Sequence, residues 1–147
     1  MHNSDLVLTY NYRVEIDGLQ VAGFSEVSGL EQEIEIEEFK EGGMDFVHKF
    51  PNGIKHSNII LKRGITVDSS LRKWYESVLD ATRYGNAPIP KEPTVYIALM
   101  DSSNSEKIRF MLKDAYPIKW SGPQLNASAS EVAFETLELV HEGLVMI

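Results

Sequence analysis

The chain has 147 residues, no cysteine and a formal net charge of −8 at pH 7. This length corresponds to a single domain, residues 1–147, that can bury a core without cross-links, and the missing thiols exclude disulfides, thiolate metal sites and cysteine nucleophiles. The acidic balance argues against nucleic-acid binding that rests on a basic surface, and the sequence has neither the basic start of a secretory signal nor an apolar run long enough to insert into a membrane.

Alternating apolar and polar residues predict three strands at the start of the chain. Tyr12, Val14 and Ile16 alternate with charged residues, which is the pattern of a half-buried strand. Asp17-Gly18 is a two-residue turn signal, after which residues 19–27 return as a second strand. Residues 30–39 form the third strand, so we expect a three-stranded antiparallel meander.

The third strand carries a row of acidic residues. Because successive side chains of a strand point to opposite faces, Glu31, Glu33, Glu35 and Glu37 share one face, while Ile34 and Ile36 face the core. One interpretation is the solvated face of a half-buried strand. The other is a row that faces a water-filled lumen shared by several subunits.

Residues 40–56 are predicted to be a long loop with unusual apolar content. Gly42-Gly43 and Pro51-Asn52-Gly53 break regular structure, and long loops in compact domains are usually functional or disordered. The loop either folds onto its own core or buries its apolar side chains against another subunit. Its apolar residues are Met44, Phe46, Val47, Phe50 and Ile54.

One amphipathic helix is expected in the middle of the chain. Residues 57–63 form a strand with Ile59 and Leu61 on one face. Asp68 is then a candidate N-cap and Gly85 a candidate C-cap. Between them, residues at helical spacing are predicted to pack onto the sheet, namely Leu71, Trp74, Tyr75, Val78 and Leu79.

The C-terminal half reads as further antiparallel strands. Residues 94–100, 107–113 and 131–141 are the predicted strands, with a polar turn over 101–105 and an extended segment near Tyr116-Pro117. Lys107, Arg109 and Lys113 form a basic row on one of them. The fold class is therefore mainly β, an antiparallel β-sandwich or barrel of about seven strands with one flanking helix.

Residues that carry chemistry are scarce. The four histidines form no metal-binding pair at helical spacing, and the sequence contains no phosphate loop and no nucleophile elbow. A hydrolase needs two carboxylates in unlike environments, whereas the acidic row offers similar groups, and a straight strand does not converge oxygens on a calcium ion. We expect no enzyme activity, no catalytic residues, no cofactor and no metal.

A series of segments is informative when its members are taken together. In chain order they are Tyr12-Arg13-Val14-Glu15-Ile16-Asp17-Gly18, Gly23-Phe24-Ser25-Glu26-Val27-Ser28-Gly29-Leu30, Glu41-Gly42-Gly43, Leu61-Lys62-Arg63-Gly64-Ile65-Thr66, Trp74-Tyr75, Ala115-Tyr116-Pro117-Ile118-Lys119-Trp120-Ser121-Gly122-Pro123-Gln124-Leu125-Asn126-Ala127, Glu131-Val132-Ala133 and the stretch from Glu135 to Leu144. These segments resemble the inner-tube protein family of contractile phage tails and phage-tail-like injection systems. Their joint order spans nearly the whole chain.

The resemblance implies a structural subunit whose hexameric rings stack into a hollow tube inside a sheath, with the apolar residues of the loop over 40–56 stacking one ring on the next. It implies self-association, contacts with sheath, baseplate and hub proteins, and a cargo in the lumen, with no membrane insertion and no sequence-specific nucleic-acid binding. Assembly in the cytoplasm would be followed by incorporation into a phage tail or injection particle. A tube-initiator ring next to the baseplate and, in another class, a monomeric acidic binding module stay open as alternatives.

Overall fold

The computed structural model describes residues 11–16, 19–43, 45–65, 67, 69–85, 88–90, 92–123 and 133–147. These residues form nine strands and one helix, in the order β1 (Asn11–Ile16), β2 (Leu19–Ser28), β3 (Gln32–Phe39), β4 (His48–His56), β5 (Ile59–Gly64), α1 (Ser70–Tyr84), β6 (Glu92–Met100), β7 (Glu106–Ser121), β8 (Phe134–Val140) and β9 (Gly143–Met146).

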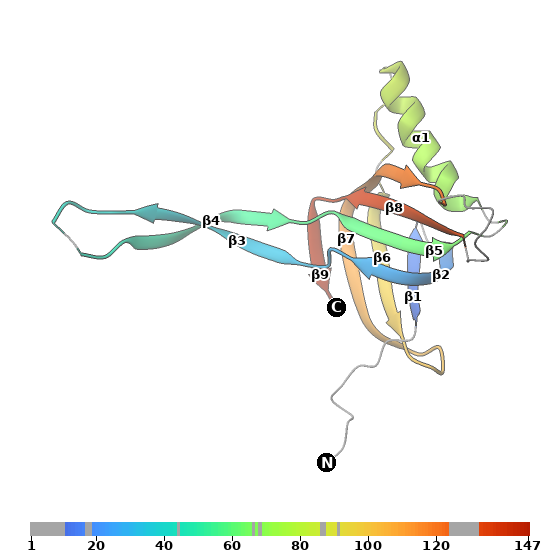
Figure 1. The fold of residues 1–147 in the computed structure, drawn as a ribbon, viewed down its shortest axis with the longest axis horizontal. Helices are drawn as coiled ribbons and strands as arrows, with labels where there is room; N and C mark the ends of the chain where they lie inside the picture. The colour runs from blue at the N-terminus through green and yellow to red at the C-terminus, as the bar shows by residue number, and fades with distance from the viewer. Residues whose placement is uncertain are drawn as a thin grey trace, which may run out of the picture.

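Six of the strands close into an antiparallel barrel (Figure 1). Their order is β6-β1-β2-β5-β8-β7, and pairing between β6 and β7 completes the circle. β9 pairs with β7 as an additional strand. The predicted mainly β fold with one flanking helix is confirmed, and closure leaves the six barrel strands without unpaired sheet edges.

Alternation along the barrel strands builds the core. Apolar residues at every second position point inward and are almost completely buried, namely Val14, Ile59, Leu61, Val95, Ile97, Leu112, Leu137 and Leu139. Polar or charged side chains such as Arg13, Lys62 and Glu138 occupy many of the alternate positions, as expected for strands with one buried face. The strands predicted around residues 12–16, 57–63, 94–100 and 107–113 are therefore present.

Two predictions, on the pairing of the third strand and on the segment that follows it, are wrong. The third strand does not join a meander with β1 and β2, because β2 pairs with β5 and β3 pairs only with β4 among the described residues. Residues 40–56 are not a loop, since β4 occupies the second half of this range. The strand predicted over 131–141 begins at Phe134 in the described part, and β9 was not predicted.

The helix α1 lies beside the barrel and contacts β7 (Figure 1). Leu71 and Trp74 join the core cluster, Val78 is buried, and Tyr75 is partly buried against the cluster. The N-cap is Ser69 rather than Asp68, which lies outside the described residues, and Gly85 ends the helix in the left-handed conformation. No helix in the described part of the chain is long and apolar enough to cross a membrane.

Arg72 connects the exposed side of α1 to the barrel. Its guanidinium lies 4.6 Å from the ring centre of Trp120 on β7, and its Nε donates to Glu76 one turn along the helix at 2.9 Å. The second contact is an exposed i,i+4 pair worth a few tenths of a kcal/mol. Apolar burial, rather than this pair, therefore holds the helix in place.

We expect Trp74→Ala to lower the free energy of unfolding by about 3–5 kcal/mol, because it empties a large buried site between helix and barrel. Trp74→Phe is the matched control, since the buried Nε1 of Trp74 has no hydrogen-bond partner among the described residues. Phe should recover most of the loss. Urea denaturation of both variants measures this, and an unchanged midpoint for Trp74→Ala would contradict the packing.

Candidate assembly surface

β3 and β4 form a two-stranded ribbon that projects from the barrel, and we call residues 32–56 the arm (Figure 1). The eight residues of β3 span roughly 27 Å at the rise of an antiparallel strand. All described residues of β3 are exposed, and no other strand of the described chain pairs with either edge of the arm. A two-stranded ribbon of this kind is marginally stable alone, so contacts outside the chain are expected to complete it.

A β-bulge in β4 divides the arm into two halves. Ile34 lies opposite Ile54, whereas Ile36 lies opposite Pro51, so β4 has one residue more than β3 between these pairs. Gly53 supplies a positive φ of 108° at this point, a conformation that favours glycine. Bulges increase the local twist, and the two strands of the arm twist about each other in Figure 1.

One face of the arm is apolar near the barrel. The register places Ile34, Ile36, Pro51 and Ile54 on this face, and Ile34 and Ile36 are 61% and 52% exposed. The prediction that these two isoleucines face the core of their own domain is therefore wrong. The predicted alternation is present in β3, but no described part of the chain buries this apolar face.

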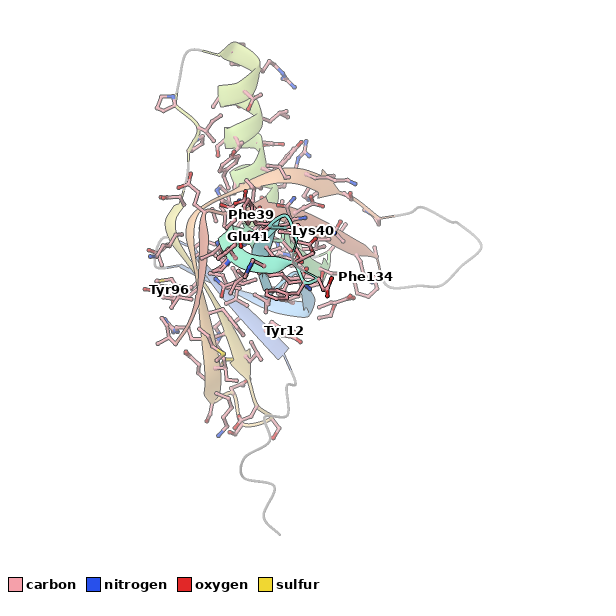
Figure 2. The ribbon with its side chains drawn as sticks, turned by 90° about the vertical axis from the view of Figure 1, so that its left-hand side faces the viewer. Tyr12, Phe39, Lys40, Glu41, Tyr96 and Phe134 are labelled. Carbon is pink, nitrogen blue, oxygen red and sulfur yellow. The ribbon has the colours of Figure 1, made fainter. Side chains whose placement is uncertain are left out.

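The opposite face is acidic near the barrel and aromatic towards the tip. Glu33, Glu35 and Glu37 alternate along β3 on this face, and Phe39 continues the row. The ring centres of Phe46 and His48 are 5.1 Å apart, and those of His48 and Phe50 are 6.1 Å apart. Figure 2 views the molecule along the arm, with Phe39, Lys40 and Glu41 labelled at the tip.

The residues predicted for ring stacking are thus distributed over both faces. Phe46, Val47 and Phe50 are exposed near the tip, and Ile54 is exposed on the apolar face. Met44 lies outside the described residues. Because the two apolar patches are on opposite faces and at different distances from the barrel, a single arm can contact two surfaces at once.

The arm leaves the barrel through a tightly packed root, which we define as residues 29–32 and 56–58. Gly29 has a φ of 91°, and a Cβ at this position would lie 1.9 Å from the carbonyl oxygen of Asn58. The Ser57 hydroxyl donates to Glu31, so this member of the acidic row is held at the root rather than on the arm. Glu31, Glu33 and Lys55 help to line an open polar hollow there.

A buried ion pair fixes the barrel near α1. Arg63 Nε donates to Glu135 Oε1 at 2.6 Å, and Trp120 Nε1 donates to Glu135 Oε2 at 3.0 Å. The two charged residues are only 3% and 7% exposed. Both carboxylate oxygens are engaged, so this cluster ties β5, β8 and β7 together instead of offering a free acid or base.

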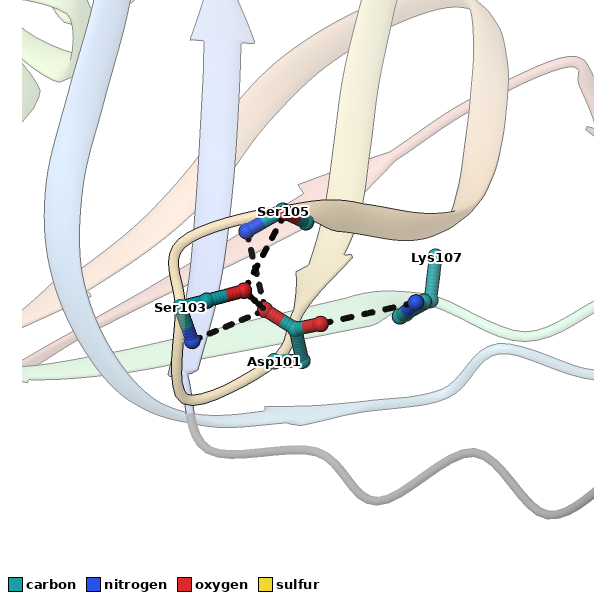
Figure 3. A network of polar contacts seen from close by, with 4 residues as sticks. All are labelled: Asp101, Ser103, Ser105 and Lys107. Carbon is teal, nitrogen blue, oxygen red and sulfur yellow. Dashed lines mark hydrogen bonds and ion pairs between the residues drawn. The ribbon is translucent and has the colours of Figure 1, made fainter. Parts of the chain in front are cut away.

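The turn between β6 and β7 is organised by Asp101 (Figure 3). Its Oδ1 accepts from the backbone N–H of Ser103 and of Ser105, each at 2.9 Å, and Lys107 Nζ lies 3.5 Å from Oδ2. Together with the Ser103 hydroxyl, which contributes most, these groups lower the pKa of Asp101 to about 2. The turn therefore keeps this stabilisation above the ordinary pKa of 3.8 and loses it as the pH falls through about 2.

The predicted basic row is largely occupied by partners within the chain. Arg109 donates to both carboxylate oxygens of Glu106, at 2.6 and 2.9 Å, and lies 3.4 Å from Glu15. The hydrogen bonds to Glu106 raise the pKa of Arg109, and the same pair lowers the pKa of Glu106. With Lys107 beside Asp101, two of the three basic residues are engaged on the barrel and not with the acidic row.

Comparison with solved structures finds chains of the same fold. The chain is similar to one in the cryo-EM structure of an extracellular contractile injection system, the PVC sheath–tube complex in the extended state, with a TM-score of 0.83 and 19% identity over 99% of this chain and 93% of that chain. A chain in the cryo-EM structure of the anti-feeding prophage tube-terminating cap matches with a TM-score of 0.83 and 19% identity, over 100% of this chain and 94% of that chain. Hcp1 from Flavobacterium johnsoniae matches with a TM-score of 0.59 and 13% identity, over 93% of this chain and 94% of that chain.

Sequence comparison assigns the chain to a family, which the similarity of fold alone does not. A comparison with curated protein sequences found no match. A family model described as T4-like virus tail tube protein gp19, however, matches residues 8–145. This range includes the closed barrel, the helix and the whole exposed arm. The chain therefore belongs to the T4-like virus tail tube protein family.

Proposed function

We propose that this tail tube protein closes into six-membered rings that stack, through the arm, into the hollow inner tube of a contractile particle. The observation that supports stacking is the arm itself, which exposes apolar patches on both faces while the barrel has a complete core of its own. Exposed apolar patches of this kind mark interaction sites. A head-to-tail contact that closes gives a ring, and a chain of similar fold, at 20% identity and a TM-score of 0.75, comes from the 6-fold symmetrised anti-feeding prophage baseplate.

In this proposal the sheath and the baseplate are the other partners. Chains of similar fold come from a sheath–tube complex, a sheath/tube terminator and a baseplate. The outer side of α1, with Arg72, Lys73 and Glu76, is our candidate surface for the sheath. The same subunit fold also suits a tube-initiator ring beside the baseplate, which is our second candidate function.

The family consists of structural tube proteins, and we assign the chain no reaction. Assembly in the cytoplasm followed by incorporation into a tail or injection particle is part of the same proposal. A monomeric acidic binding module is the competing class. It predicts that the arm stays free in solution, whereas the tube subunit predicts that the arm is covered.

Mass photometry and cryo-EM of the purified chain, alone and with its sheath and baseplate partners, test the proposal. We expect rings of six copies and, at high concentration or on a baseplate, stacked tubes with the arm buried between copies. Isolated rings are expected to be weaker than tubes, because each contact adds stability by mass action. A chain that remains monomeric in every condition, including inside a native particle, would contradict the proposal.

We also propose that Glu33, Glu35 and Glu37, with Glu31 at the root, face the lumen of the tube. In a six-membered ring the row repeats six times, and a negative wall repels phosphate or acidic cargo at close range, so that cargo slides rather than sticks. Salt screens such a wall within about 8 Å at physiological ionic strength, so the repulsion does not prevent ring closure.

Replacing all four residues of the row with glutamine is therefore expected to preserve tube assembly and to change cargo retention or transit. Assembly is measured by electron microscopy and retention by the amount of cargo that co-purifies with tubes. Glu38→Gln together with Glu41→Gln is the control, because Glu38 lies on the other face of β3. Loss of assembly in the four-fold variant would mean that the row belongs to a subunit interface.

A further inference from the structure

We propose that His56 and His141 form a pH-sensitive clasp that holds the root of the arm against the C-terminal segment, residues 141–144, and that mild acid opens it. The two rings come from opposite sides of this contact, because His56 ends β4 and His141 follows β8. Their ring centres are 5.1 Å apart, with an angle of 54° between the ring planes.

Both sides of the arm root are bonded to the same C-terminal segment. On the β3 side, Gln32 Nε2 donates to the carbonyl oxygen of Leu144 at 3.1 Å. On the β4 side, His141 Nε2 lies 3.0 Å from the carbonyl oxygen of Ser57. These contacts bridge more than eighty residues of sequence, so they fix the direction in which the arm leaves the barrel.

His141 is placed between two acceptors. Its Nδ1 lies 3.1 Å from the carbonyl oxygen of Gly143, and its Nε2 faces the carbonyl of Ser57. A neutral imidazole has one N–H and can donate to only one of the two carbonyls. A second proton would satisfy both, but it would place a positive charge on a side chain that is buried and in contact with a second histidine.

The pKa of His141 is affected more by burial and by His56 than by the two carbonyl groups. Burial, the largest effect, lowers the pKa of His141 below its ordinary value of 6.5, and the neighbouring His56 lowers it further, while the carbonyls of Ser57 and Gly143 act in the opposite direction. The ring nitrogen Nδ1 of His56 is also buried and has no hydrogen-bond partner among the described residues. Burial therefore favours the neutral form of His141.

The charged groups around the clasp carry both signs. On the arm side, Glu31, Glu33 and Lys55 line the polar hollow at the root. On the other side, the side chain of Lys113 on β7 packs beside Gly143, and the backbone N–H of Glu142 donates to the Lys113 carbonyl at 2.8 Å.

The direction of the pH effect follows from the lowered pKa. A group whose pKa is depressed in the folded state contributes stability that is present above its ordinary pKa, here 6.5, and is lost as the pH falls through the folded value. Protonation of His141 places a positive charge in this buried contact with the ring of His56. The clasp is thus closed at neutral pH and opens in mild acid, which would redirect the arm.

Hydrogen–deuterium exchange of the full chain at low concentration tests the clasp. After correction for intrinsic rates, we expect protection of residues 31–34 and 55–58 to be lower at about pH 5 than at about pH 7.5. His56→Phe keeps a ring without a titratable charge and should lose less protection at the lower pH, because it removes the effect of His56 on His141 but not the effect of burial. His48→Phe, on the same strand but at the tip of the arm, should respond as the original chain does.

NMR titration of the unsubstituted chain provides a measurement that does not depend on any variant. His141 should titrate below 6.5, and its pKa should rise in His56→Phe. A His141 pKa at or above the ordinary value, or root protection that is equal at both pH values, would overturn the clasp. Any effect on tube stacking rests on the proposed function, whereas exchange and NMR report on single subunits and can fail independently of it.

Discussion

Ile36→Asp and Phe46→Asp are each expected to abolish tube elongation while the subunit keeps its fold. Both side chains are more than half exposed in the single chain, so the substitutions remove nothing from the barrel core. If stacking buries them, each loses roughly 1.5–3 kcal/mol of apolar burial and brings an unpaired carboxylate into the contact. The loss repeats at every copy in a ring, so the effect on tube length should be large.

Electron microscopy of assembly reactions measures tube length, and circular dichroism with thermal melts checks the fold. Tyr84→Asp is the matched control, because Tyr84 is 70% exposed at the end of α1, away from the arm. It should form tubes of normal length in the absence of sheath. Normal tubes from both arm variants would contradict a role for the arm in stacking.

The barrel and the helix could be predicted from the sequence because their signals are local. Val14 lies between the charged residues Arg13 and Glu15 and is completely buried. Leu71, Trp74 and Val78 recur at helical spacing, and Gly85 adopts the left-handed conformation expected of a C-cap. In each case the residues that determine the strand or helix are close to each other in sequence.

The arm could not be predicted in the same way, because its strand β4 contains strand-breaking residues. Pro51 and Gly53 normally argue against a strand, and here they lie at the bulge where a register shift accommodates them. Proline is tolerated at sheet edges, and both strands of a two-stranded ribbon are edges. The residue pattern alone therefore predicts a loop over residues 40–56.

The local pattern also does not indicate what an apolar face packs against. Ile34 and Ile36 alternate with glutamates as a half-buried strand should, yet both stay more than half exposed in the described structure. The pairing of Arg63 with Glu135 escapes local pattern for another reason, since the residues are 72 positions apart and the pairing of β5 with β8 brings them together. Neither feature follows from residues that are close in sequence.

Gly29→Ala is expected to be among the most destabilising single changes in this chain. The residue has a φ of 91°, which an L-residue adopts only with strain of about 1–3 kcal/mol. A methyl group there would lie 1.9 Å from the carbonyl oxygen of Asn58. Because this neighbour is backbone, the start of β5 must move, and such overpacking typically costs a further 1–3 kcal/mol.

Gly42→Ala is the matched control for this prediction. Gly42 lies at the tip of the arm, where an added Cβ meets nothing within 4 Å, so its free energy of unfolding should change by less than about 0.5 kcal/mol. Urea denaturation of both variants gives the comparison. Equal midpoints would show that the root is not packed as described. A shift confined to Gly29→Ala, accompanied by loss of tubes, would show that the barrel and the direction of the arm depend on the same backbone contact.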